Sequence, residues 1–130
     1  MTRGVLHDTS DSDGFVAVEN GVIAGFILYE MRESQCELLV LESVKENQGV
    51  GTSLLDAVKM VARENACTRV WLITTNDNTH AIRHYQRRGF ELIAVHIDAV
   101  AESRRLKPSI PLTGFDDIPI KHEFEFAARL

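Results

Sequence analysis

The sequence has little cysteine and proline, and its acidic residues outnumber its basic ones. Cys36 and Cys67 are too few for a disulfide framework and lack metal-ligand spacing, so we expect both to be reduced packing residues. Nineteen Asp and Glu against fourteen Lys and Arg give a formal net charge of -5. This balance argues against the usual basic nucleic-acid-binding surface, and no nucleic-acid partner is expected.

Long apolar runs are also missing. None could cross a bilayer, and residues 1–8 lack the apolar core of a signal peptide. The sequence therefore predicts no membrane partner, and the expected location is the cytoplasm. With 130 residues, 45% of them hydrophobic and 25% charged, the chain has the size and composition of one globular domain over residues 1–130.

The first half of the chain begins with a pattern typical of strands. Residues 15–19 and 22–31 favour β-structure, and Asn20-Gly21 between them is the signal of a type I′ turn. We therefore expect an antiparallel hairpin. Residues 35–41 end in four consecutive apolar residues, which predicts a third strand buried on both faces.

Helix and strand patterns alternate from there on. Residues 52–65 carry one apolar stripe, and Thr52 or Ser53 can cap the start of this helix. The short apolar strand 70–73 follows, so strand, helix and strand should form a right-handed parallel crossover. A second helix is expected over 78–88, ended by a glycine.

The C-terminal region predicts two more strands. Residues 90–97 form one, and the segment 99–130 contains the other at 120–126. Residues 99–106 are either a short helix or a loop. With residues 1–13 as a poorly defined lead-in, the sequence predicts a single-domain mixed α/β (α+β) fold with a mostly antiparallel sheet and flanking helices.

A glycine-containing loop, Glu46-Asn47-Gln48-Gly49-Val50-Gly51-Thr52, lies between the third strand and the first helix. Backbone N–H groups and the helix dipole at such a place can hold a phosphate. The alternative is that the two glycines only make a tight turn. The pattern of a P-loop is absent, and the third glycine of a dinucleotide fingerprint is missing.

A second motif, Asn78-x-x-Ala81-x-x-x-Tyr85-x-x-x-Gly89-Phe90, follows the apolar strand. Together with the glycine loop it resembles the GCN5-related N-acetyltransferase (GNAT) superfamily, in the same order and over residues 15–97. The resemblance implies a GNAT-like fold, acetyl-CoA as cosubstrate and no metal. In that family the loop binds the coenzyme A pyrophosphate, and the pantetheine arm pairs with a strand that corresponds to residues 35–41.

The cofactor-binding residues that the resemblance implies lie on the strand, the loop and the second helix. They are Leu39, Leu41, Gln48, Gly49, Val50, Gly51, Thr52, Ser53, Asn78 and Tyr85. The amide of Leu39 is the expected donor to the oxyanion that forms when an amine attacks.

Two residues are candidates for acid–base catalysis. Tyr85 can supply a proton as the carbon–sulfur bond breaks; the alternative is a packing tyrosine on an amphipathic helix. Glu37 is the candidate base for the acceptor ammonium, and its alternative is a solvated strand residue. His80 and His84 alone have metal-ligand spacing, but no further ligand lies near them in the sequence.

The sequence departs from the family pattern at two places. Glu46 stands where the family usually has Gln or Arg, so it is an improbable ligand of a pyrophosphate. Only about a dozen residues precede Phe15, where the family normally has a strand and one or two helices that form a wall of the acceptor site.

The sequence therefore predicts an N-acetyltransferase that moves an acetyl group from acetyl-CoA to a primary amine of a small molecule or a protein. The alternative is a non-catalytic acyl-CoA-binding or sensor module with an incomplete acceptor site. A homodimer is a further alternative, because exposed strand edges near the C-terminal segment can pair with a second copy of the chain.

Overall fold

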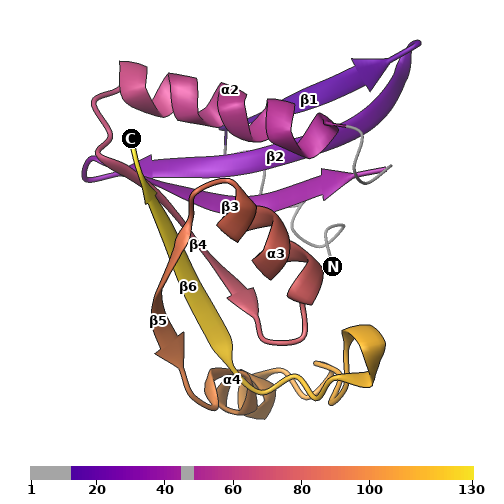
Figure 1. Cartoon of the computed structure of the whole chain (residues 1–130). Coiled ribbons are helices and arrows are strands. Elements are labelled where there is room, and N and C mark those ends of the chain that lie inside the picture. Colours follow the sequence, from indigo (N-terminus) through magenta and orange to yellow (C-terminus); the bar gives the residue numbers. More distant parts are fainter. Residues whose placement is uncertain (1–12, 45–48) are drawn as a thin grey trace. The chain divides into compact units, whose positions relative to one another are not determined.

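The computed structural model describes residues 13–44 and 49–130 (Figure 1). In chain order the elements are β1 (Asp13–Glu19), β2 (Val22–Arg32), β3 (Gln35–Ser43), α2 (Val50–Glu64), β4 (Arg69–Thr75), α3 (Thr79–Arg87), β5 (Glu91–His96), α4 (Ala99–Leu106), the 3-10 turn η2 (Phe115–Asp117) and β6 (Glu123–Arg129).

The strands have the hydrogen-bonded order β1-β2-β3-β4-β6-β5. This confirms the predicted mixed fold with a mostly antiparallel sheet and flanking helices. Two compact units can be distinguished, one of residues up to Val70 together with Arg129–Leu130, and one of Trp71–Ala128. Each is described by itself below.

The first unit begins with the predicted hairpin. β1 and β2 pair antiparallel, and both turn residues have positive φ, 52° at Asn20 and 79° at Gly21. A type I′ turn requires positive φ at both central residues, and Asn-Gly adopts it most readily. The Asn-Gly signal therefore identified the turn correctly.

Helix α2 lies along one face of β1, β2 and β3 (Figure 1). Gly25 on β2 allows this close packing, because a Cβ there would lie 2.9 Å from Cγ1 of Val50 and 2.6 Å from the carbonyl oxygen of Glu42. The buried core of this unit is apolar. Its most enclosed side chains include Ile27, Cys36, Leu38, Leu54, Leu55, Val58 and Ala62.

Two local predictions for this unit are wrong. β3 is not buried on both faces, because Leu38 is 5% exposed while Leu39 is 37% exposed. Neither Thr52 nor Ser53 caps α2, because the helix begins earlier, at Val50, with Gly49 as the N-cap and no side-chain cap. The two hydroxyl residues therefore lie inside the first turns of the helix.

The start of β4 lies beside the start of β3. Thr68 N–H donates to the carbonyl oxygen of Ser34 at 2.8 Å, and Arg69 Nε donates to Oε1 of Gln35 at 3.0 Å. Adjacent starts are what two neighbouring parallel strands require, as the crossover predicts. Cys36 and Cys67 are both free and buried, as expected, and burial raises the pKa of the Cys36 thiol to about 12.

The second unit contains α3, β5, α4 and most of β6. Residues 99–106 form a helix, which decides between the two alternatives that the sequence left open. β5 pairs with β6 antiparallel. The last strand begins at Glu123 instead of residue 120, because the side chain of Asn76 holds the backbone at Pro119 and Lys121.

Among the helices that the structure describes, we find none that is both long and apolar enough to span a membrane.

Candidate active site

The third strand has a β-bulge at Leu39. In the ladder with β2, Leu38 faces Tyr29 and Val40 faces Leu28, so Leu39 is an additional residue without a partner on β2. A bulge leaves the extra residue outside the ladder and bends the strand locally. The bulge therefore falls on the residue whose amide the sequence assigns to the oxyanion.

Glu37 lies two residues before the bulge and is half-buried. Its partner across the ladder is Glu30, so two carboxylates stand opposite each other on the sheet. Like charges at directly opposed positions repel each other. Arg32 lies near this pair and forms an ion pair with Glu30.

The start of α2 presents a glycine with open space around it. Gly49 has φ 80° and ψ -4°, and among the residues that the structure describes a Cβ built on it would meet nothing within 4 Å. Its carbonyl oxygen accepts from Ser53 N–H at 2.9 Å, which is the first turn of the helix. The N–H groups at the start of a helix have no intrahelical acceptor, so this end of α2 is suited to an anion.

The other predicted loop residues differ in exposure. Val50 is buried in the core, Gly51 and Thr52 are half-buried, and Ser53 is exposed. Gln48 lies outside the described residues, as does Glu46. On β3, Leu41 is half-buried and follows the bulge by two residues.

Helix α3 begins at the predicted cap. The side-chain oxygen of Asn78 accepts from Ala81 N–H at 3.2 Å, and its amide nitrogen donates to Oγ1 of Thr74 at 3.3 Å. Gly89 ends the helix region with φ 91°. Both ends therefore agree with the sequence motif, and the second role of Asn78, at a pantetheine arm, stays a prediction.

Tyr85 is the buried residue of α3, with 7% of its surface exposed. Its ring makes edge contacts with Phe90 at 5.3 Å and with His84 at 5.2 Å between centroids. Burial raises the pKa of Tyr85 well above the ordinary value of 10.0. The phenol therefore keeps its proton throughout the physiological range, which a hydrogen-bond donor or acid requires.

His84 is half-buried, and its Nε2 is enclosed without a hydrogen-bond partner. Burial is the main cause that lowers its pKa, and the charges of Arg88, His80 and Arg87 add to the effect. The imidazole is therefore neutral at pH 7. Within residues 13–44 and 49–130, no three His, Cys, Asp or Glu side chains form a group that can hold a metal ion.

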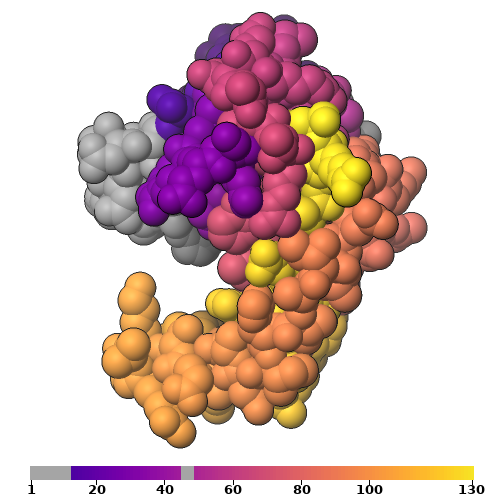
Figure 2. All heavy atoms as spheres, turned by 90° about the vertical axis from the view of Figure 1, so that its left-hand side faces the viewer, coloured from indigo at the N-terminus to yellow at the C-terminus, as the bar shows by residue number. Residues whose placement is uncertain are grey.

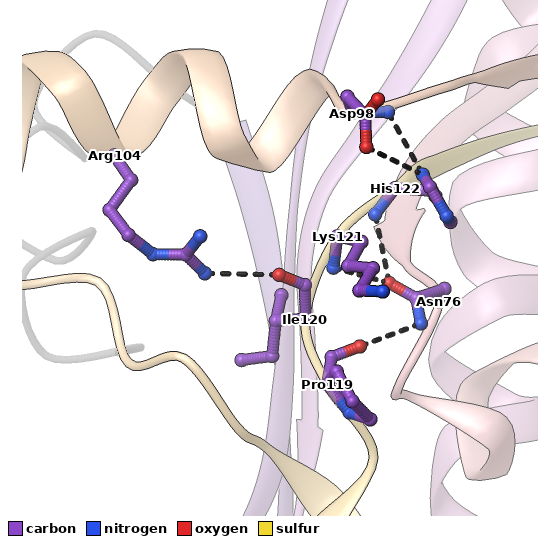
Figure 3. A network of polar contacts seen from close by, with 7 residues as sticks. All are labelled: Asn76, Asp98, Arg104, Pro119, Ile120, Lys121 and His122. Atoms are coloured by element: carbon purple, nitrogen blue, oxygen red, sulfur yellow. Dashed lines mark hydrogen bonds and ion pairs between the residues drawn. The ribbon is translucent and has the colours of Figure 1, made fainter.

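Asn76, a residue that no sequence pattern singled out, makes three side-chain hydrogen bonds in the second unit (Figure 3). Its Oδ1 accepts from the N–H groups of Lys121 at 2.8 Å and His122 at 2.9 Å, and its Nδ2 donates to the carbonyl oxygen of Pro119 at 2.9 Å. Its backbone N–H donates to His122 O at 3.0 Å. One amide thus fixes the segment that leads into β6.

Asp77, the next residue, is 3% exposed. Its two carboxylate oxygens accept from the hydroxyl of Thr75 at 2.5 Å and from Phe115 N–H at 3.2 Å. Gly114 packs so closely on this carboxylate that a Cβ there would overlap Oδ2 at 2.0 Å. Asn76, Asp77 and the cap Asn78 therefore fix the loop from which α3 starts.

Arg104 on α4 holds the same C-terminal segment from the other side. Its guanidinium donates to the carbonyl oxygens of Ile110 at 3.2 Å, Pro111 at 2.9 Å and Ile120 at 3.0 Å. Arg104 is half-buried, and its side chain holds this segment in place. One arginine of a short basic stretch carries no sequence signal for such a role.

We predict that Asn76→Ala lowers the free energy of unfolding by about 2 kcal/mol, because two N–H groups and one carbonyl lose their partner at once. Asn65→Ala is the matched control, since Asn65 makes one exposed side-chain hydrogen bond, to Val61 O at 2.8 Å. Asn65→Ala should lower the free energy of unfolding by less than about 1 kcal/mol. Urea unfolding of both variants measures the difference, and equal losses would contradict the role assigned to Asn76.

Comparison with known proteins identifies the family of this chain. The family model "Acetyltransferase (GNAT) family" matches residues 2–90. The chain is 47% identical over 116 residues to "Uncharacterized protein YdhI" of Bacillus subtilis (strain 168), covering 88% of this chain and 72% of that protein. It is 40% identical over 126 residues to "Uncharacterized protein YxbD" of the same organism, covering 96% of this chain and 79% of that protein.

The fold is similar to that of a solved GNAT family acetyltransferase from Elizabethkingia anophelis with acetyl-CoA bound. The TM-score is 0.84 at 16% identity, and the match covers 100% of this chain and 84% of the other. At this identity the likeness shows the fold alone. The family match and the two Bacillus relatives go further: the chain belongs to the GNAT family of acetyltransferases.

Proposed function

We propose that this protein transfers an acetyl group from acetyl-CoA to a primary amine by direct attack. The observation that carries the proposal is the bulge at Leu39 on β3, in the same unit as the glycine start of α2. A strand residue outside its ladder can offer its amide to a ligand, and a helix start can hold a phosphate. Together these features suit a long cosubstrate that carries a pyrophosphate at one end and a thioester at the other.

For the cosubstrate we assign the backbone N–H groups of the loop 48–53 to the pyrophosphate. Leu39 and Leu41 would pair with the pantetheine arm as an added strand does. Acetyl-CoA is bound in the Elizabethkingia anophelis structure, which supports the same cosubstrate here. The open space at Gly49 fits a ligand that approaches the backbone closely.

Gly49→Val should weaken acetyl-CoA binding at least about tenfold, because the new side chain occupies the space needed by the pyrophosphate. Gly21→Val is the control: its φ of 79° is the same and its Cβ also meets nothing, but it lies in the hairpin turn. Both positions have φ near 80°, so both variants carry backbone strain, and thermal unfolding measures how much stability each loses. A loss of affinity in Gly49→Val alone, at a similar loss of stability, assigns the effect to the start of α2. Calorimetric titration with acetyl-CoA, CoA and ATP measures the result.

Unaltered affinity in Gly49→Val would place the cosubstrate elsewhere. Absence of binding by the unmodified chain would overturn the assignment of the loop.

In the proposed reaction, the amine nitrogen forms a bond to the thioester carbon and the carbon–sulfur bond breaks. The amide of Leu39 donates to the oxygen that becomes negative in the intermediate, a type of contribution worth about 3 kcal/mol in other acyl transfers. Glu37 accepts the proton that the ammonium must lose, directly or through water. Tyr85 donates toward the sulfur as it leaves as thiolate.

Tyr85→Phe should lower turnover by about 10- to 100-fold and leave acetyl-CoA affinity nearly unchanged. The variant lacks a hydrogen bond to sulfur that forms only as negative charge develops on the leaving thiolate. Tyr29→Phe removes the hydroxyl of another buried tyrosine, 6% exposed, and should leave turnover unchanged. Steady-state rates together with titrations separate the two effects. Normal turnover in Tyr85→Phe would remove this residue from the mechanism.

Glu37→Gln should abolish the acid limb of the pH–rate profile and lower the rate by about 10²-fold or more, because glutamine cannot accept the proton. With Glu37 intact, activity falls as the pH falls through the pKa of the base, since protonation removes the acceptor. Glu30→Gln, the opposite carboxylate on β2, should keep the limb. An acid limb unchanged in Glu37→Gln would show that another group is the base.

The acceptor is a primary amine, and the net charge of -5 favours a cationic one. Polyamines, aminoglycosides, lysine side chains and protein N-termini all fit this chemistry. The second candidate is an acyl-CoA-binding or sensor module without turnover. An assay of CoA release from acetyl-CoA in the presence of these amines distinguishes the two candidates. Release with any of them indicates the enzyme, and binding of acetyl-CoA without release indicates the binding module.

A further inference from the structure

Asp77 lies in the loop between β4 and α3, one residue before the helix cap Asn78. Among the residues that the structure describes, it is the one charged side chain that is buried, with 3% of its surface exposed. Transfer of a carboxylate out of water is costly unless hydrogen bonds replace the lost hydration. The position of Asp77 therefore depends on the groups that donate to it.

The two donors to this carboxylate come from different parts of the second unit. The Thr75 hydroxyl lies at the end of β4, and the Phe115 N–H lies in the segment 113–115, 38 positions after Asp77. The carboxylate also stands just before the first turn of α3, where a helix favours negative charge. Asp77 thus joins the start of α3 to a segment that is distant in the sequence.

Polar contacts hold the segment around Phe115 in place. Leu112 is 72% exposed and Phe115 is 61% exposed, so apolar burial contributes little to its position. Figure 2 shows atoms of this segment, in light orange, on the outer surface of the second unit. Gly114 lies directly on the Asp77 carboxylate, and a Cβ there would lie only 2.8 Å from Cγ. The contact therefore requires a residue without a side chain.

The position of Tyr85 depends on where α3 starts. Ile82 N–H donates to the carbonyl oxygen of Asn78 at 3.1 Å, and such hydrogen bonds make a short helix move as one body. A buried carboxylate that loses its donors must turn toward water, which displaces the start of α3 and the phenol with it. Misplacement of a catalytic group by about 1 Å can lower a rate about 100-fold.

From these contacts we propose that Asp77 is a positioning residue: by binding the segment 113–115 it fixes the start of α3, and so the place of the Tyr85 phenol. The inference rests on the proposed function, in which Tyr85 donates to the sulfur. The family model matches residues 2–90. A segment outside that match would therefore set the position of a residue inside it.

A double-mutant cycle tests whether Asp77 acts through Tyr85. Asp77→Ala should lower turnover about tenfold in the unmodified chain and less than about twofold in Tyr85→Phe, because the phenol that it positions is already absent. A merely structural role predicts equal losses in both backgrounds, and that result would overturn the proposal.

Two further variants complete the cycle. Asp77→Asn should restore most of the turnover lost in Asp77→Ala, since an amide oxygen still accepts from Phe115 N–H. Asp98→Ala is the matched control, because Asp98 also precedes a helix, α4, but makes no side-chain cap. Its turnover should be unchanged.

Hydrogen exchange gives a readout that does not require activity. Amides of α3 should exchange at least about fivefold faster in Asp77→Ala and in Gly114→Ala, while those of β1 keep their rates. Gly14→Ala is the control for Gly114→Ala, because its Cβ would lie only 2.5 Å from the carbonyl oxygen of Ile27 in the first unit. It should leave the exchange of α3 unchanged.

Circular dichroism verifies that each variant is folded. Unchanged exchange of α3 in folded Asp77→Ala and Gly114→Ala would overturn the proposal. Absence of turnover in the unmodified chain would instead overturn the proposed function, and hydrogen exchange would still decide whether Asp77 fixes α3.

Discussion

Where a strand ladder is interrupted, backbone N–H and C=O groups must find other partners. Each unit of the chain has such an interruption, and it lies beside the residues that matter most in that unit. In the second unit the stretch 119–122 lies before the ladder of β6; Pro119 forms only an isolated bridge with Thr113, and the amide of Asn76 makes three hydrogen bonds to the stretch. In the first unit the ladder between β2 and β3 skips Leu39. The irregularity before β6 is thus closed by a side chain, whereas the one at Leu39 is the feature on which the proposed site for the cosubstrate rests.

Sequence reasoning succeeded where one residue type determines a local conformation. Asn20-Gly21 sets positive φ at two successive positions, and Asn78 caps the helix that it precedes. These conformations depend on residues that are adjacent in the sequence, so they can be predicted from the sequence alone. The glycine loop and the helix motif occur in the order that is typical of the GNAT family, and this resemblance predicted the fold.

The failures concern contacts between residues far apart in the chain. The bulge at Leu39 depends on its register with Tyr29 and Leu28, and the importance of Asn76 depends on backbone groups more than forty positions later. The earlier start of α2 has the same origin, since Val50 is drawn into the core by packing on Gly25. No periodicity within a segment contains this information.

Burial of Tyr85 limits the chemistry that this residue can perform. A free thiol has a pKa of about 8.5, and burial holds the pKa of Tyr85 well above its ordinary 10.0, so full proton transfer to a finished thiolate is unfavourable. A hydrogen bond to sulfur while negative charge develops does not meet this obstacle, and a low-dielectric surrounding strengthens it. The environment that makes Tyr85 a poor acid is therefore compatible with the donor role proposed for it. For the proposed reaction, we infer that the proton finally carried by CoA comes from solvent or from the amine, and that Tyr85 acts by stabilising charge on the sulfur.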